Sequence, residues 1–221
     1  MRIGVLGTGN MADALATHWV RAGHEVTIGG RDAEKAKRLA MRIGGSAKPA
    51  GLRGAAEFGQ VVLVALPFDA GAAVARELRA ALDCKVLLDC SNPLGPGFRL
   101  LTEGGASAAQ QLAAAAPGAH VVKAFNLCHE DVWRMRPPVF DGRPLAVPVC
   151  GDDDASLARV RELVRDTGCM PIVGGGLERA GLLEAAAALF IALWVEEGAD
   201  VQAIAPPLAY AAGPTPSPKG G

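Results

Sequence analysis

The chain has 221 residues, enough for one α/β domain with a small C-terminal addition. Half of the residues are hydrophobic and a fifth are charged, so the chain can bury a sizeable core. The formal net charge of −1 excludes the basic surface by which proteins bind nucleic acid or anionic membranes.

Targeting signals and cysteine spacing indicate the cellular compartment of the protein. The chain opens on an apolar strand pattern without the features of a secretory signal, and its most apolar late segment, residues 182–195, is too short to cross a bilayer. Five cysteines are scattered without C-x-x-C spacing, which indicates neither a disulfide framework nor a zinc site. We therefore expect a cytoplasmic protein with no metal site and no membrane or nucleic-acid partner.

The first predicted elements form a β-α-β unit. Residues 3–6 have the pattern of a buried strand, a glycine turn then opens an amphipathic helix, and residues 25–28 supply a second strand. The turn has the spacing G-x-G-x-x-A, in which Gly7 permits a tight turn, Gly9 lets the backbone approach a pyrophosphate and Ala12 keeps the helix close to the strand. The phosphates would bind free N–H groups at the start of the helix. The unit predicts a dinucleotide site; the alternative is a turn with a purely structural role.

The end of the second strand indicates which dinucleotide is bound. An NAD site has Asp or Glu here to bind the ribose 2′-hydroxyl, whereas this strand ends in Gly29, Gly30 and Arg31. Arg31 can hold a 2′-phosphate with its planar guanidinium, and Lys35 follows one helical turn later. We therefore expect NADP(H) as the cofactor. The alternative is that Arg31 and Lys35 are ordinary surface charges at the start of a helix.

The remaining elements alternate between strands and helices. We expect strands near residues 46–47 and at residues 61–66, 85–89, 120–126, 145–150 and 170–173, and helices at residues 32–40, 55–58, 69–82, 107–116 and 153–166. The positions of helix caps are held by Asp32, Asp69, Ser107 with Gln110, and Asp153 or Asp154. The alternation predicts an α/β protein with a Rossmann-type, doubly wound, mostly parallel sheet.

The domain organisation follows from this pattern. We expect a single NADP-binding domain over residues 1–198, in which residues 151–198 carry the closing strand and a C-terminal apolar helix. Residues 199–221 are rich in proline and poor in apolar residues, which is typical of a disordered tail.

Ligands on such sheets bind beyond the carboxyl ends of the strands. Residues 66–68, 91–93 and 124–126 follow three of the predicted strands and are therefore expected near the ligand. The long loop at residues 127–144 is too apolar for a simple linker, and loops of this length are often functional. We interpret it as a segment that could cover the nicotinamide pocket.

The strongest helical pattern covers residues 178–197, a length of roughly 30 Å at 1.5 Å per residue. Apolar residues recur at helical spacing, namely Leu182, Leu183, Ala186, Leu189, Phe190, Leu193 and Trp194. Ile191 and Val195 widen this apolar face. Two interpretations stay open: a core helix packed on the sheet edge, or a subunit interface.

Successive motifs along the chain resemble those of one known family. The motif residues are Gly7-Thr8-Gly9-Asn10-Met11-Ala12, Gly30-Arg31, Asp89-Cys90-Ser91-Asn92-Pro93-Leu94, Val122-Lys123-Ala124-Phe125-Asn126, Cys150-Gly151-Asp152-Asp153 and Gly174-Gly175-Gly176-Leu177-Glu178-Arg179-Ala180. They resemble the deazaflavin (coenzyme F420)-dependent NADP reductase family and cover residues 1 to about 195 in order. The resemblance implies a Rossmann domain, NADPH as hydride carrier and, frequently, a homodimer, here through residues 178–197. The same nucleotide domain occurs in membrane metalloreductases.

The resemblance also implies roles for individual residues. By position, Thr8, Asn10 and Met11 join Gly7 and Gly9 at the pyrophosphate, Arg31 and Lys35 hold the 2′-phosphate, and Pro67, Asn92 and Pro93 line the nicotinamide side. Members that reduce the deazaflavin carry a His in an Ala-Leu-His run, where this chain has Ala124-Phe125-Asn126. The acceptor is therefore expected to be either the deazaflavin or a small C=O or C=N substrate.

Hydride transfer depends mainly on the alignment of two rings, but a carbonyl or imine acceptor also needs a proton. Lys123, Asn126 and His129 are the candidate catalytic residues, and Ser91 is a further proton source. Lys123 can instead pair with a local carboxylate, and His129 can instead cap a helix. Cys90 and Cys128 are expected to be small buried hydrophobic residues.

The leading hypothesis is an NADP(H)-dependent oxidoreductase that acts on a small molecule or a ring cofactor. The alternative is a non-catalytic NADP(H)-sensing or partner-binding module, which the weak set of acid–base residues favours. The sequence leaves the hydride acceptor, the reaction direction and the oligomeric state open.

Overall fold

The computed structural model describes residues 1–102 and 104–204, and its centre is an eight-stranded sheet with the order β10-β9-β6-β5-β4-β1-β2-β3. The strands are β1 (Arg2–Leu6), β2 (Glu25–Gly29), β3 (Lys48–Ala50), β4 (Val61–Val64), β5 (Val86–Asp89), β6 (His120–Lys123), β9 (Ala146–Gly151) and β10 (Met170–Gly175). Neighbouring strands are parallel except for β6 and β9, which are antiparallel. The first six strands have the doubly wound order of dinucleotide-binding folds, so the predicted fold class is confirmed.

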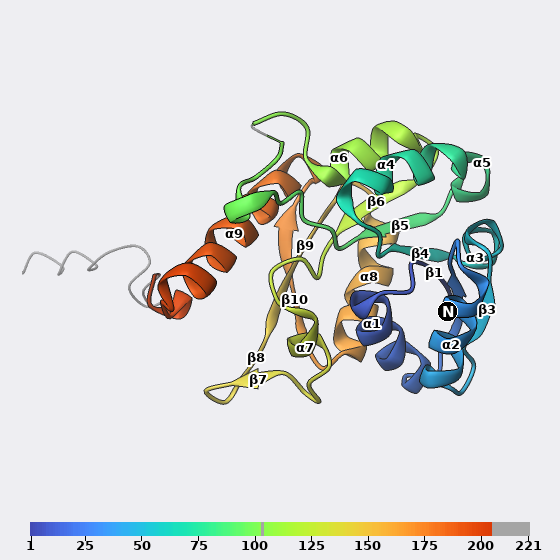
Figure 1. The fold of residues 1–221 in the computed structure, drawn as a ribbon, viewed down its shortest axis with the longest axis horizontal. Coiled ribbons are helices and arrows are strands. Elements are labelled where there is room, and N and C mark those ends of the chain that lie inside the picture. The colour runs from blue at the N-terminus through green and yellow to red at the C-terminus, as the bar shows by residue number, and fades with distance from the viewer. Residues whose placement is uncertain (103, 205–221) are drawn as a thin grey trace, which may run out of the picture.

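Helices cover both faces of this sheet (Figure 1). They are α1 (Asn10–Arg21), α2 (Ala33–Ile43), α3 (Leu52–Phe58), α4 (Phe68–Glu77), α5 (Arg79–Leu82), α6 (Ala108–Ala115), α7 (Glu130–Trp133), α8 (Asp154–Asp166) and α9 (Ala180–Ala192). One face packs against α1, α2, α7 and α8, and the other against α3, α4, α5 and α6. A short hairpin, β7 (Val139–Phe140) and β8 (Arg143–Pro144), follows α7.

The two faces have separate hydrophobic cores because successive side chains of a strand point to opposite sides. In β4, Val61 and Leu63 belong to the core beneath α1 and α8, whereas Val62 and Val64 belong to the core beneath α4 and α6. A strand that is covered on both faces reads as a continuous apolar run, which is what the sequence has here.

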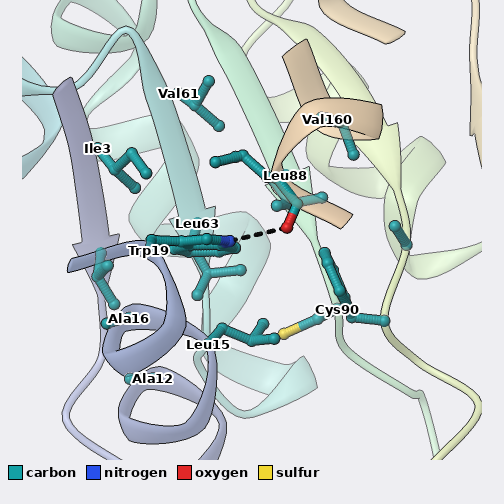
Figure 2. Packing of buried hydrophobic residues seen from close by; sticks show 14 of the residues in the cluster. Ile3, Ala12, Leu15, Ala16, Trp19, Val61, Leu63, Leu88, Cys90 and Val160 are labelled. Carbon is teal, nitrogen blue, oxygen red and sulfur yellow. Dashed lines mark hydrogen bonds between the residues drawn. The ribbon is translucent and has the colours of Figure 1, made fainter. Parts of the chain in front are cut away.

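Trp19 fixes helix α1 to the sheet. Its ring is fully buried, and its Nε1 donates a hydrogen bond to the Leu163 carbonyl of α8 at 3.1 Å. Figure 2 shows the ring among Ile3, Leu15 and Leu63, with this hydrogen bond as the dashed line. The core thereby sets the position of α1, and with it the position of the glycine turn from which α1 starts.

Most predicted helix starts are confirmed at the level of single hydrogen bonds. Asp32 and Asp153 accept N–H groups of α2 and α8, and Ser107 with Gln110 forms a capping box at α6. Asp69 is not a cap, because α4 already begins at Phe68 and Pro67 holds the N-cap position. The predicted third strand lies two residues later, at Lys48–Ala50.

The apolar C-terminal segment differs from the predicted continuous helix. It comprises a 3₁₀ turn (Leu177–Arg179), α9 and a π-helical end (Leu193–Glu197), and Figure 1 shows α9 extending away from the rest of the fold. Only Ala180, Glu184 and Ala187 of α9 are buried. Leu182, Leu189, Trp194 and Val195 are exposed, whereas Leu183, Phe190, Ile191 and Leu193 are half-buried, so only part of the apolar face packs on the fold. No helix in the described ranges is long and apolar enough to cross a membrane.

The predicted tail starts with an ordered turn. Residues Val201–Ile204 form a 3₁₀ turn in which Val201 is buried, so the first part of the predicted disordered segment has defined structure. The remainder, residues 205–221, lies outside the described residues.

Candidate active site

The glycine turn joins β1 to α1 where the strand order reverses. Gly7 has a φ of +129°, and an added Cβ would lie 2.1 Å from the Ala65 carbonyl oxygen, so only glycine fits there. At Gly9 nothing lies within 4 Å of an added Cβ, and its φ of −88° is open to any residue. The protein's own packing therefore requires Gly7 but not Gly9. The open space in front of Gly9 leaves room for a ligand to approach the backbone.

The start of α1 is suited to an anion. The first N–H groups of an α-helix have no partner inside the helix, and here the N-cap residue is Gly9, which offers no side-chain acceptor. Asn10 is exposed and Met11 is half-buried beside the turn. The Asn10 side chain donates to Glu130 at 2.7 Å. A phosphate in front of Gly9 would meet free backbone donors at the positive end of the helix dipole.

The end of β2 lies directly beside this turn. The Gly7 N–H donates to the Gly29 carbonyl at 2.9 Å, and an added Cβ on Gly30 would lie 2.8 Å from the Thr8 side chain. Arg31 and Lys35 follow, and both are exposed. No ion pair among the described residues includes either cation.

Asp32 is the carboxylate next to these cations. It accepts the Lys35 N–H at 3.0 Å, and this hydrogen bond to the backbone lowers the pKa of the carboxyl. Asp32 is therefore engaged as the cap of α2, whereas the exposed side chains of Arg31 and Lys35 are available to an anionic ligand.

The predicted site residues follow one another along a single sheet edge. The strand order β2-β1-β4-β5-β6 places Arg31, the glycine turn, Pro67, Asn92 and Asn126 in that sequence at the carboxyl ends. With about 4.8 Å between neighbouring strands, the distance from β2 to β5 is about 14 Å. An extended ligand could contact the predicted phosphate and nicotinamide residues at the same time.

A small pocket lies at the predicted nicotinamide end. Leu66, Pro67 and Phe68 after β4 line it, together with Ser91 after β5 and Gln111 of α6. The other lining residues are Val64, Gly71, Ala72, Ala108 and Leu112, so no His, Lys, Cys or acidic residue in the described part of the chain lines this pocket. The pocket is largely apolar and offers no strong general acid, and its volume of about 10 Å³ is that of a single water molecule, so a ring would have to lie across its mouth.

A buried cluster of charges lies behind this pocket. The Lys123 ammonium of β6 contacts Asp89 Oδ2 of β5 at 2.7 Å and Glu184 Oε1 of α9 at 2.8 Å, and all three side chains have no exposed surface. Lys123 also donates to the Ser91 carbonyl at 2.5 Å. Burial on its own lowers the pKa of Lys123, but attraction to Asp89 and Glu184 outweighs it and raises the pKa above the ordinary value. Lys123 is therefore a permanently charged core residue.

Two asparagines connect the same elements. Asn92 Nδ2 donates to the Asn126 carbonyl at 2.7 Å, and Asn126 Nδ2 donates to Asn92 Oδ1 and to the Leu183 carbonyl of α9, both at 3.0 Å. Asn126 is buried, and so is Pro93, the residue that follows Asn92 in the chain. Asn126 thus holds the loop after β5 against α9.

His129 lies elsewhere, at the start of α7. Its side chain is 66% exposed, and its Nδ1 accepts the Asp131 N–H as the helix cap. Trp133 of the same helix is buried and packs edge-on against Phe125 at 5.4 Å, and Arg134 pairs with Asp13 of α1. This part of the predicted lid is packed against α1 as a wall of the domain.

The structure therefore separates the three candidate catalytic residues. Lys123 does not face the pocket as expected but forms the local ion pair that was the alternative, because its side chain has no exposed surface. Asn126 has both amide hydrogens engaged, and His129 acts as an exposed cap. Burial raises the pKa of the Cys90 thiol to about 12 and that of Cys128 to about 11, so neither thiol is a nucleophile at neutral pH.

Sequence reasoning missed Asp89 and Glu184 as members of the site. One signal could have found them: a lone carboxylate in an apolar helix, and a lysine at the end of an apolar strand, need buried partners of opposite charge.

Elsewhere in the fold, the side chains of His24, Glu162 and Asp166 bring potential metal ligands within 4.8 Å of one another. Both ring nitrogens of His24 already have partners, Asp166 and the Met1 amine. These three residues are also remote in sequence from the predicted site residues at the carboxyl ends of β2, β1, β4, β5 and β6, the edge of the sheet that we call the ligand edge.

Comparison with known proteins gives consistent matches. Residues 2–93 match the family described as NADP oxidoreductase, coenzyme F420-dependent. The F420-dependent NADP reductase of Methanothermobacter marburgensis is 31% identical over 210 residues, and the match covers 87% of this chain and 92% of that protein. Metalloreductase STEAP3 of Rattus norvegicus is 31% identical over 193 residues, 87% of this chain, but this chain spans only 38% of its length. A solved structure of a provisional F420-dependent NADP reductase from Arthrobacter sp. FB24 is 27% identical with a TM-score of 0.80, covering 90% of this chain and 95% of that one.

The two glycines of the turn should respond differently to substitution. Gly7→Ala should lower the free energy of unfolding by about 2–3 kcal/mol, because its Cβ would clash with Ala65, whereas Gly9→Ala should change it by less than about 0.5 kcal/mol. Gly9→Ala should nevertheless weaken dinucleotide binding by about tenfold or more, a change of about 1.4 kcal/mol. Urea unfolding and calorimetric titration measure the two effects. Full dinucleotide affinity in Gly9→Ala would contradict a ligand lying against this turn.

Proposed function

The chain belongs to the family of F420-dependent NADP reductases, and on this premise we propose that it transfers hydride between NADPH and an oxidised deazaflavin. The observation that carries the proposal is the open glycine turn beside two exposed cations, on the same sheet edge as a small, largely apolar pocket without acid–base groups. NADP(H) is the cofactor, and the deazaflavin is the co-substrate.

The phosphate groups would be bound at the β1 and β2 ends. Backbone donors of Gly9, Asn10 and Met11 would hold the pyrophosphate, with Gly7 and Thr8 shaping the turn, and Arg31 with Lys35 would hold the 2′-phosphate. A carboxylate at the end of β2 would repel this phosphate. Asp32, which follows Arg31 directly, is engaged as a helix cap, and Glu34 lies within the first turn of α2. These groups would favour NADPH over NADH.

The nicotinamide would lie toward Pro67, Asn92 and Pro93. NADPH supplies the hydride when bound, and a deazaflavin ring takes it up together with a proton from solvent. The lining of the pocket supports such an acceptor over a C=O or C=N substrate, since the latter needs a proton donor in the transition state. Asn126 would act by holding Asn92 in place, whereas His129 would remain outside the reacting centre.

We extend the proposal to a homodimer in the cytoplasm. Leu182, Leu189 and Val195 are exposed by 53–65% in the single chain, on the segment that extends away from the fold, and Ile172 and Val173 of the edge strand β10 are exposed as well. A second copy covering these side chains would remove them from water. A reducing cytoplasm suits five free cysteines.

Turnover with the two nicotinamide cofactors tests the proposed reaction. Protein mixed with NADPH and the oxidised deazaflavin should bleach the deazaflavin's visible absorbance, and NADH should support this reaction far less well. Arg31→Glu should lower the affinity for NADPH by about ten- to a hundredfold, because it replaces a charge-assisted contact with repulsion, and should change NADH binding little. Equal loss for both cofactors would contradict the assignment of Arg31.

A matched substitution controls for the loss of a surface charge. Arg53→Glu removes an exposed cation on α3 whose one ion pair among the described residues is with Glu57 at 3.9 Å, and it should leave both affinities unchanged. NADPH binding without bleaching would instead support the sensing module, or an acceptor with a C=O or C=N group, and those acceptors would be tried next.

The oligomeric state tests the exposed helix face. Leu189→Asp should convert the dimer to a monomer, since it places a charge in the covered apolar face, while Met41→Asp on the exposed surface of α2 should not. Sedimentation equilibrium distinguishes the two states. A wild-type chain that sediments as a monomer would contradict the dimer.

A further inference from the structure

A single acidic residue on the otherwise apolar helix α9 is tied to the predicted nicotinamide pocket. Glu184 is fully buried and is 61 positions from Lys123 in sequence, yet its Oε1 lies 2.8 Å from the Lys123 ammonium. Its other oxygen accepts the Ala108 N–H at the start of α6 at 3.0 Å. None of the roles proposed so far uses this residue.

The contacts continue from Glu184 to the pocket in three steps. Glu184 binds Lys123, Lys123 binds Asp89 Oδ2 at 2.7 Å, and Asp89 Oδ1 accepts both the N–H and the hydroxyl of Ser91, at 3.0 and 2.7 Å. Lys123 adds a direct contact to the Ser91 carbonyl. Ser91 lines the pocket at the end of this path, and Ala108, whose N–H Glu184 accepts directly, lines it as well.

The geometry fixes the hydrogen-bonding role of Ser91. A hydroxyl carries one hydrogen and two lone pairs, and here the hydrogen is donated to the Asp89 carboxylate. The other oxygen of Asp89 lies 2.7 Å from the Lys123 ammonium, so both carboxylate oxygens act as acceptors here. Toward a ligand in the pocket the Ser91 hydroxyl can then only accept a hydrogen bond.

We propose that Glu184 is a positioning residue of the nicotinamide site: through Lys123 and Asp89 it holds Ser91 as an acceptor for an N–H donor of the bound ring, such as the carboxamide of nicotinamide. This inference rests on the proposed NADPH binding. Glu184 supplies the second carboxylate that, together with Asp89, surrounds the buried ammonium. Without it, Lys123 and the loop after β5 lose their connection to α9 and to the start of α6.

A second connection from the same helix supports this role. The Leu183 carbonyl, next to Glu184, accepts a hydrogen bond from Asn126, whose amide also donates to Asn92. Two consecutive residues of α9 thus hold two consecutive residues of the loop after β5, one through charges and one through amides.

The test compares binding of the whole dinucleotide with binding of its adenosine part, which carries the 2′-phosphate. Calorimetric titration would measure the affinities of the wild type, Glu184→Gln and Ser91→Ala for two ligands. One is NADPH, and the other is adenosine 2′,5′-bisphosphate, which contains the 2′-phosphate but lacks the nicotinamide. Both variants should bind NADPH about two- to tenfold more weakly, the value of one hydrogen bond, and the bisphosphate with unchanged affinity. Ser91→Thr, which keeps the hydroxyl, should restore NADPH affinity.

Glu77→Gln is the matched control, because Glu77 is an exposed glutamate on α4 that makes no ion pair within the described part of the chain. It should bind both ligands like the wild type. Glu184→Gln leaves a buried ammonium with one carboxylate, so the variant could fail to fold. Ser91→Ala keeps all three charges and decides the question in that case.

Three outcomes are distinguishable. Selective loss of NADPH affinity, with Thr rescue at position 91, supports the proposal. A folded Glu184→Gln or Ser91→Ala variant that binds NADPH like the wild type, or that loses both ligands equally, overturns it. A wild-type protein that binds neither ligand overturns the proposed function itself.

Discussion

The contact between the Lys123 ammonium and two carboxylates is the interaction on which the ligand edge of this fold depends. A fully buried ammonium cannot persist without partners, and removing one partner of a buried pair costs about 3–5 kcal/mol. The two carboxylates exceed the single cation by one negative charge, and N–H groups of Ala108 at the start of α6 and of Ser91 offset this excess. One charged cluster thereby joins β5, β6, α6 and α9.

The two halves of the ligand edge are built by different physical means. The proposed phosphate half uses backbone shape and exposed charge: the turn at Gly7 and Gly9, and the exposed cations Arg31 and Lys35. The nicotinamide half uses buried polar contacts that hold a loop beside an otherwise apolar pocket. This division suits a reductase in which phosphates supply affinity and a rigid pocket supplies ring alignment.

Local sequence signals predicted the glycine turn, the helix caps and the alternation of strands and helices well, because each depends on residues close together in the chain. The glycine spacing and the caps at Asp32 and Ser107 are settled within a few residues, and the strand order follows from β-α-β alternation. The nicotinamide half depends on contacts over 34 and 61 positions, which no spacing rule contains. Lys123 was therefore interpreted as facing the pocket. The helical pattern also gave the apolar face of α9 without showing that its buried side is the one that carries Glu184.

The most direct test of the account is the transfer of deuterium from NADPH that carries deuterium at both hydrogen positions of C4 of the dihydronicotinamide. The account predicts that, in a reaction with the oxidised deazaflavin, the label appears on a ring carbon of the reduced deazaflavin and that mass spectrometry finds it there in a single turnover. Because direct hydride transfer does not exchange with solvent, the label should not be diluted by water. A reduced deazaflavin that carries no label, or label lost to water, would contradict direct hydride transfer at this sheet edge.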